Sequence, residues 1–189
     1  MVILTLILFV ALFFTFEMTT TITSNSSLTN DPNSLFAHPH HVYLLVVQSN
    51  MVRYDGIRGS WDRVVPPECQ PSPQIFRLDC MLSWSMAKEP LHAGIYPRDK
   101  LARIGPGMPF AKHILELELG FGTNGLVPCV FGGTSMDEWC CNYTQRNSPS
   151  NLYWNLIFRA KASERTAGRL AGLMWWQGGA DAVHKEVAS

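Results

Sequence analysis

The sequence lacks an excess of charge of either sign. Its 189 residues include 15 Lys and Arg against 15 Asp and Glu, so the formal net charge is zero. Proteins that bind nucleic acids normally carry a basic excess, because Lys and Arg displace the counterions of the phosphates. We therefore expect no nucleic-acid partner. Charged residues amount to only 16% while hydrophobic residues reach 47%, a composition that supports one packed domain rather than a disordered chain.

Metal-binding patterns are missing as well. The sequence contains no C-x-x-C, and no spacing of His and Cys typical of zinc sites. The histidine-rich run at residues 38–41 (HPHH) is better explained as a polar segment before a strand. We therefore predict neither a metal nor a cofactor. The odd number of cysteines leaves at least one thiol unpaired or joined to another molecule. These cysteines are Cys69, Cys80, Cys129, Cys140 and Cys141.

Lys and Arg are also absent before Arg53, although residues 2–16 are nearly all apolar. As a helix at ~1.5 Å per residue, this run covers about 22 Å, less than the ~30 Å hydrocarbon core of a bilayer. The length favours a secretory signal peptide over a membrane span. We expect residues 1–24 to be a signal peptide or, if uncleaved, a membrane anchor, and residues 25–41 to be a linker. The protein would then be secreted, in agreement with the glycosylation sequons at Asn25 and Asn142.

Short apolar runs alternate with amphipathic segments in the rest of the chain, residues 42–189. Strands are predicted at residues 42–47, 75–78, 126–131 and 171–176, and helices at 108–119 and 152–169. This alternation predicts an α/β domain whose parallel sheet has helices packed on its faces. Pro128 would remove a hydrogen-bond donor from its strand, so we expect a bulge or a strand end there.

Polar or glycine-rich turns follow three of these strands. Ser49 follows the first, Gly132, Gly133 and Thr134 follow the third, and Gln177 follows the last. The carboxyl ends of parallel strands meet at one edge of a sheet, so we expect these residues to converge. Each alone is better explained as a turn, cap or loop residue. Together, a hydroxyl, backbone N–H groups and a carboxamide are the groups needed to form and stabilise a tetrahedral acyl-transfer intermediate.

Six sequence blocks, in order along the chain, resemble the SASA-domain carbohydrate esterases, the sialate O-acetylesterase-like branch of the SGNH hydrolases, and especially their plant members. The matching blocks are residues 48–51 (QSNM), 61–69 (WD and PPEC), 89–92 (EPLH), 105–111 (GPGM and FA), 125–139 (GLVPC, GGT and EW) and 175–181 (WWQG and D). The resemblance implies a three-layer α/β sandwich with a central parallel sheet, SGNH or flavodoxin-like, incomplete at its C terminus.

The resemblance also implies roles for particular residues. Ser49 would be the nucleophile, and its own N–H, that of Gly133 and the Gln177 amide would form the oxyanion hole. The substrates would be O-acetylated sugars. Supporting positions would be Asn50, Gly132, Thr134 and Asp181.

The catalytic base is the main departure from the family pattern, which takes it from an Asp-x-x-His segment near the C terminus. This sequence stops at Ser189, so we expect that segment to be missing and activity to be impaired. Asp181 and His184 have the same spacing, but Asp181 matches a different block, which leaves His184 a weak candidate. His92 and His113 are weaker still. Without a base, a serine hydrolase keeps only a small residual rate.

Two other functions remain open on the sequence alone. The chain could be a secreted, non-catalytic relative that binds carbohydrate in the same cleft. With an uncleaved N-terminal segment, it could instead be a membrane-anchored interaction protein, and only in that case would a membrane be a partner.

A signal peptide makes a direct prediction about the mature N terminus. Protein secreted by a eukaryotic host should begin between residues 19 and 27, because the apolar run ends just before this polar stretch. Mass spectrometry of the N-terminal peptide measures this. Recovery of chains that begin at Met1 from the membrane fraction would contradict secretion and favour the anchored protein.

Overall fold

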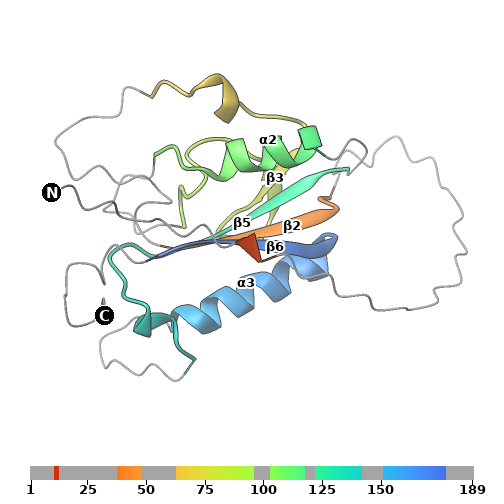
Figure 1. Ribbon diagram of the computed structural model, residues 1–189. Coiled ribbons are helices and arrows are strands. Elements are labelled where there is room, and N and C mark those ends of the chain that lie inside the picture. The colour runs from red at the N-terminus through yellow and green to blue at the C-terminus, as the bar shows by residue number, and fades with distance from the viewer. Residues whose placement is uncertain are drawn as a thin grey trace, which may run out of the picture.

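The structure, a computed structural model, describes residues 11–12, 38–47, 63–95, 103–117, 122–141 and 151–177. In this part of the chain, a six-stranded sheet has the order β1-β6-β2-β5-β3-β4 (Figure 1). The central strands β6, β2, β5 and β3 run parallel, and the edge strands β1 and β4 are antiparallel to their neighbours. The strands are β1 (Ala11–Leu12), β2 (His41–Val47), β3 (Ile75–Leu78), β4 (Trp84–Met86), β5 (Asn124–Val130) and β6 (Arg169–Trp176).

Helices cover both faces of this sheet. The helix α2 (Gly107–Leu117) lies on one face and α3 (Leu152–Thr166) on the other, which gives three layers (Figure 1). Two short 3₁₀ helices, η1 (Pro67–Cys69) and η2 (Asp137–Trp139), lie in the connections. The predicted α/β sandwich with a parallel central sheet is therefore confirmed.

The core lies along β2 and β5, which are covered on both faces. Every residue of β5 is buried, as expected for a central parallel strand. Tyr43 of β2 packs edge-to-face against Phe110 of α2, with ring centroids 5.2 Å apart. Leu152 and Ala160 of α3 bury against the opposite face. The core thus fixes β2 and β5 in the middle of the domain.

Element boundaries differ from the sequence prediction by a few residues. The helix expected over residues 152–169 ends at Thr166, because the chain turns there to enter β6. The Gly168 N–H donates to Pro39 O at 2.7 Å, and a side chain at Gly168 would collide with the His40 carbonyl. Strand β4 was not predicted, since its three residues are too few to show a period. The expected signal peptide and linker fall outside the described residues, except for residues 11–12 and 38–41.

The expectation for Pro128 is half right. β5 has no bulge and continues in register with β2, with Pro128 opposite Leu45. On its other side, β5 stops pairing with β3 before Pro128, since the last pair with β3 is Arg77 and Leu126. The Asn124 N–H points to that side, donating to Gln74 O, and backbone direction alternates along a strand, so residue 128 faces β3 as well. Proline therefore occupies a position where the strand would otherwise present an N–H to β3.

A buried arginine replaces the missing donor. In a regular parallel ladder, an N–H at residue 128 would donate to Leu78 O. Arg159 of α3 makes that bond instead, with Nη2 2.8 Å from Leu78 O and Nη1 3.1 Å from Asp79 O. Its side chain is only 6% exposed. Arg159 thus ties α3 to the carboxyl end of β3.

Removing this guanidinium should destabilise the fold. Arg159→Met keeps much of the side-chain volume but leaves Leu78 O unpaired and Asp79 O with only the Leu82 N–H, so we expect a loss of about 2–4 kcal/mol in the free energy of unfolding. Chemical denaturation measures it. The matched control is Arg165→Met, exposed on the same helix, which should cost less than about 0.5 kcal/mol. Equal costs for the two variants would contradict the role of Arg159.

Candidate functional site

The register of the central strands brings three strand ends to one edge. Val47, the last residue of β2, pairs with Val130 of β5 and with Trp176 of β6. The three strands therefore end level with one another. Gly132, Gly133 and Thr134 come directly after β5, and Gln177 directly after β6. Ser49 and Asn50 lie two and three residues beyond Val47, outside the described residues.

A side chain at the end of β6 reaches the turn after β5. The Gln177 Nε2 group donates to Thr134 O at 2.6 Å. β2 lies between β5 and β6, and neighbouring strands are ~4.8 Å apart, so the two ends are separated by about 10 Å. The link from Gln177 to Thr134 therefore passes the carboxyl end of β2, where the chain continues toward Ser49.

The turn after β5 depends on glycine at one position. Gly133 has φ of +77°, in the left-handed region that favours glycine, and a Cβ there would meet nothing within 4 Å. Backbone conformation, not lack of space, therefore selects glycine. Gly133 is exposed, whereas the next residue, Thr134, is buried. The turn thus presents an exposed backbone at the edge and anchors it through Thr134.

Several hydrogen bonds hold that turn. Thr134 Oγ1 donates to Phe131 O at 3.1 Å and accepts from Trp139 Nε1 at 3.2 Å. The Glu138 carboxylate accepts from the Ser135 N–H at 2.6 Å. The pair Glu138 and Trp139 of η2 appears in the sequence only as part of a matching block, with no role that its pattern could reveal. In the structure, both side chains anchor the turn.

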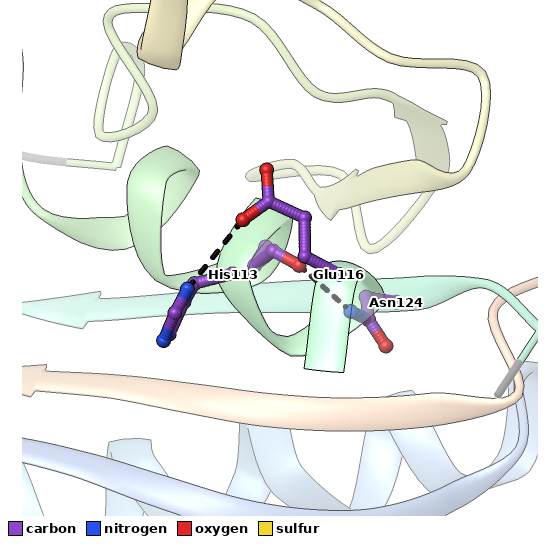
Figure 2. Close-up of polar contacts among 4 residues, drawn as sticks. His113, Glu116 and Asn124 are labelled. Carbon is purple, nitrogen blue, oxygen red and sulfur yellow. Dashed lines mark hydrogen bonds and ion pairs between the residues drawn. The ribbon is translucent and has the colours of Figure 1, made fainter. Parts of the chain in front are cut away.

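His113 lies away from this edge. His113 is exposed on α2 and lies 3.5 Å from Glu116 of the same helix (Figure 2). Asn124, the first residue of β5, donates to Ala111 O at 3.1 Å and so fixes this part of α2 at the amino end of the strand (Figure 2). That end is about 20 Å from the carboxyl end. His113 is therefore excluded as a base for this edge.

The other two histidine candidates are His92 and His184. His92 is fully buried in the segment after β4. Asp181 and His184 lie outside the described residues, so their predicted roles stay predictions. Within the described ranges, His, Cys, Asp and Glu side chains form no group of three or more that could hold a metal ion. In the same ranges, no helix has the length and apolar character needed to cross a membrane.

A small cavity of about 80 Å³ lies between α3, η2 and the end of β5. Its lining is mostly apolar and includes Phe131, Trp139, Leu152 and Leu156. Phe131 directly precedes the glycine turn, and Trp139 is bonded to Thr134. The cavity is therefore continuous with the residues that hold the turn.

Two of the five cysteines are excluded as nucleophiles. All five are free thiols. Burial raises the pKa of Cys129 to about 12 and that of Cys69 to about 11. Only a thiolate is an effective nucleophile, so these two buried groups are inert near neutral pH.

Three comparisons relate this chain to known proteins. Residues 39–189 match the protein family described as carbohydrate esterase, sialic acid-specific acetylesterase. A probable carbohydrate esterase of Arabidopsis thaliana is 36% identical over 153 residues, covering 77% of this chain and 56% of that relative. An X-ray structure of an Arabidopsis thaliana protein has 34% sequence identity and a TM-score of 0.65, covering 79% of this chain and 62% of that chain. This chain thus spans less than two thirds of the length of either protein.

A partly buried carboxyl group, Glu89, lies in one of the matching blocks, after β4. Its Oε2 accepts from the Leu91 N–H at 2.9 Å. Burial raises the pKa of Glu89 to about 7, against the opposing effects of the Leu91 and Gly105 N–H groups and of the Arg77 guanidinium. Sequence reasoning assigned this residue no role, because its burial depends on how the loop folds back.

The raised pKa of Glu89 predicts a pH-dependent stability. The folded state holds this proton up to about pH 7, whereas the unfolded chain releases it near the ordinary value of 4.5. Stability from this group is therefore fully present below pH 4.5 and lost as the pH rises to about 7, a change on the order of 3 kcal/mol.

Urea unfolding at several pH values between 4.5 and 8 tests this prediction. Glu89→Gln should remove most of the decline, while Glu164→Gln, exposed on α3, should leave it as in the wild type. An unchanged decline in Glu89→Gln would show that other groups cause it.

Proposed function

Because the chain belongs to the family of carbohydrate esterases described as sialic acid-specific acetylesterases, we propose that it hydrolyses O-acetyl esters of sugars with Ser49 as nucleophile. The bond of Gln177 to Thr134 is the observation that carries the proposal. It joins the ends of β6 and β5 past the end of β2, from which Ser49 is two residues away. This supports the placement of Ser49, Gly133 and Gln177 at one edge of the sheet.

The reaction follows from these groups. The Ser49 Oγ attacks the acetyl carbonyl carbon, and the carbonyl oxygen becomes an oxyanion. Collapse of this intermediate breaks the bond to the sugar oxygen, which leaves as a hydroxyl after taking up the proton that the Ser49 hydroxyl gave up. Water then attacks the acetyl-serine and releases acetate, which restores the Ser49 hydroxyl.

The oxyanion needs donors at fixed positions, and we assign the N–H groups of Ser49 and Gly133 together with the Gln177 carboxamide. The Gln177 Nε2 atom has two hydrogens, and only one is needed for the bond to Thr134 O. The second can therefore serve the oxyanion. One such donor is typically worth ~10²–10³ in rate. Gly132, Thr134, Asn50 and Asp181 would support these groups.

The size of the acyl group is consistent with the cavity beside the turn. The volume of about 80 Å³ accommodates a short acyl chain but not a sugar ring. This supports acetyl esters over esters of long fatty acids. The sugar itself would lie outside the cavity, at the open edge.

We assign no catalytic base within the described residues. His113 lies at the wrong end of β5, and Asp181 with His184 matches a different family block from the expected Asp-x-x-His. We therefore propose that the 189-residue chain by itself turns over slowly. Secretion, from the apolar N-terminal segment, would place the protein with extracellular carbohydrate.

Replacement of the nucleophile tests the proposal. The 189-residue chain should hydrolyse 4-nitrophenyl acetate at well under ~1 s⁻¹, the lower limit of typical enzymes. Ser49→Ala should abolish this residual rate, and Ser85→Ala, exposed on β4, should leave it unchanged. Spectrophotometric release of nitrophenol measures the rates.

The same assay separates the competing functions. A residual rate that survives Ser49→Ala would overturn the serine mechanism. Turnover above ~1 s⁻¹ that Ser49→Ala removes would show that this chain already contains a working base. No hydrolysis, combined with binding of an acetylated oligosaccharide that Ser49→Ala leaves intact, would favour the carbohydrate-binding relative.

A further inference from the structure

We propose that Trp139 is a positioning residue that holds the Gln177 carboxamide in place at the carboxyl end of β2. This inference rests on the proposed function, since it concerns one of the assigned oxyanion donors. Trp139 lies in η2, after the turn that follows β5. It acts through Thr134.

The first link is the bond between the indole and the threonine hydroxyl. Trp139 Nε1 donates to Thr134 Oγ1 at 3.2 Å, and the hydroxyl passes its own hydrogen to Phe131 O at 3.1 Å. Trp139 is 8% exposed and Thr134 is 3% exposed. A hydroxyl that both donates and accepts inside the protein has little freedom to rotate. Trp139 therefore fixes the orientation of Thr134.

The second link is between Thr134 and the amide. Thr134 O accepts from Gln177 Nε2 at 2.6 Å. Because a carbonyl oxygen repels the amide oxygen and attracts the amide nitrogen, this contact determines which end of the carboxamide faces the turn. It therefore also fixes the direction of the second Nε2 hydrogen, the one assigned to the oxyanion.

The third link is a contact between two tryptophan rings. The Trp139 ring packs edge-to-face against Trp175 of β6, with centroids 5.4 Å apart and an angle of 69° between the ring planes. Trp175 is two residues before Gln177. Trp139, Thr134, Gln177 and Trp175 thus form a closed ring of contacts that joins β5 to β6, two strands that are not neighbours in the sheet. Trp139 contacts the turn after β5 through Thr134 and contacts β6 through Trp175.

A purely structural role for Trp139 is the competing explanation. A buried tryptophan stabilises the fold by its apolar area alone, and phenylalanine keeps much of that area and the edge-to-face packing. Trp139→Phe removes the N–H donor specifically. A packing role predicts a small loss of stability and no effect at Gln177, whereas the positioning role predicts a change in the amide and in catalysis.

The experiment compares Trp139→Phe with a matched control, Trp154→Phe, whose tryptophan is 57% exposed on α3. The first readout needs no activity. In ¹⁵N-labelled protein, the Gln177 side-chain amide gives a pair of proton signals, one of which should exchange slowly with solvent. Trp139→Phe should shift both signals and raise the exchange rate of the slow one at least tenfold, and Trp154→Phe should do neither.

The second readout is the acylation of Ser49 by 4-nitrophenyl acetate in a single turnover. Because small displacements of a catalytic group cost up to ~10²-fold, we expect Trp139→Phe to lower the acylation rate about tenfold, with the half-saturating ester concentration changed by less than about twofold. Thr134→Val removes the other partner of the same bond. The double variant should be no slower than the slower single variant, because both remove one interaction.

The outcomes separate the inference from the proposed function. Unchanged Gln177 amide signals in Trp139→Phe overturn the inference, and so does a changed amide with an unchanged acylation rate. If the wild type shows no reaction that depends on Ser49 but the amide still shifts, the proposed function fails and the link from Trp139 to Gln177 is supported. Should Trp139→Phe not fold, Thr134→Val gives the same two readouts.

Discussion

The level ends of β6, β2 and β5 are the constraint on which the candidate site depends. Parallel strands place their carboxyl ends at one edge, but they need not end at the same height. Here the pairing of Val47 with both Val130 and Trp176 makes them level, so the turns that follow start from one line. The hydrogen bond between Gln177 and Thr134 is possible only because of this register. A shift by one residue would also move side chains to the opposite face.

Burial of β5 makes that register hard to change. All seven residues of the strand are buried, between β2 on one side and, for its first half, β3 on the other. Pro128 ends the pairing with β3 without a cost, because Arg159 supplies the donor that proline lacks. The second half of β5 is thus released from β3 and leads into the glycine turn. The side chain of Arg159 on α3, rather than a strand, therefore bonds to the carboxyl end of β3.

The family and the geometry support the same function by independent routes. Matching blocks run in order along the chain, and the structure brings two of them, the GGT and WWQG segments, into direct contact. Neither the matching blocks nor the described geometry identifies the base, and the chain spans 56% of its curated Arabidopsis relative. In the structure, the exclusion of His113 rests on geometry, because Asn124 fixes α2 at the amino end of β5. Spacing along the sequence could not have shown this.

The sequence by itself determined the architecture and the family. Apolar period and turn residues are local signals, so strands such as Ile75–Leu78 and the starts of both helices could be predicted to within a residue, as could the edge that Gly133 and Gln177 share. The place of Ser49 at that edge stays a prediction. Only the tertiary structure decided how that edge is held. The contacts of Trp139 with Thr134, of Arg159 with Leu78 and the burial of Glu89 join residues through folding, and no local pattern encodes them. Hydrogen bonds between distant segments depend on distances that exist only after the layers pack.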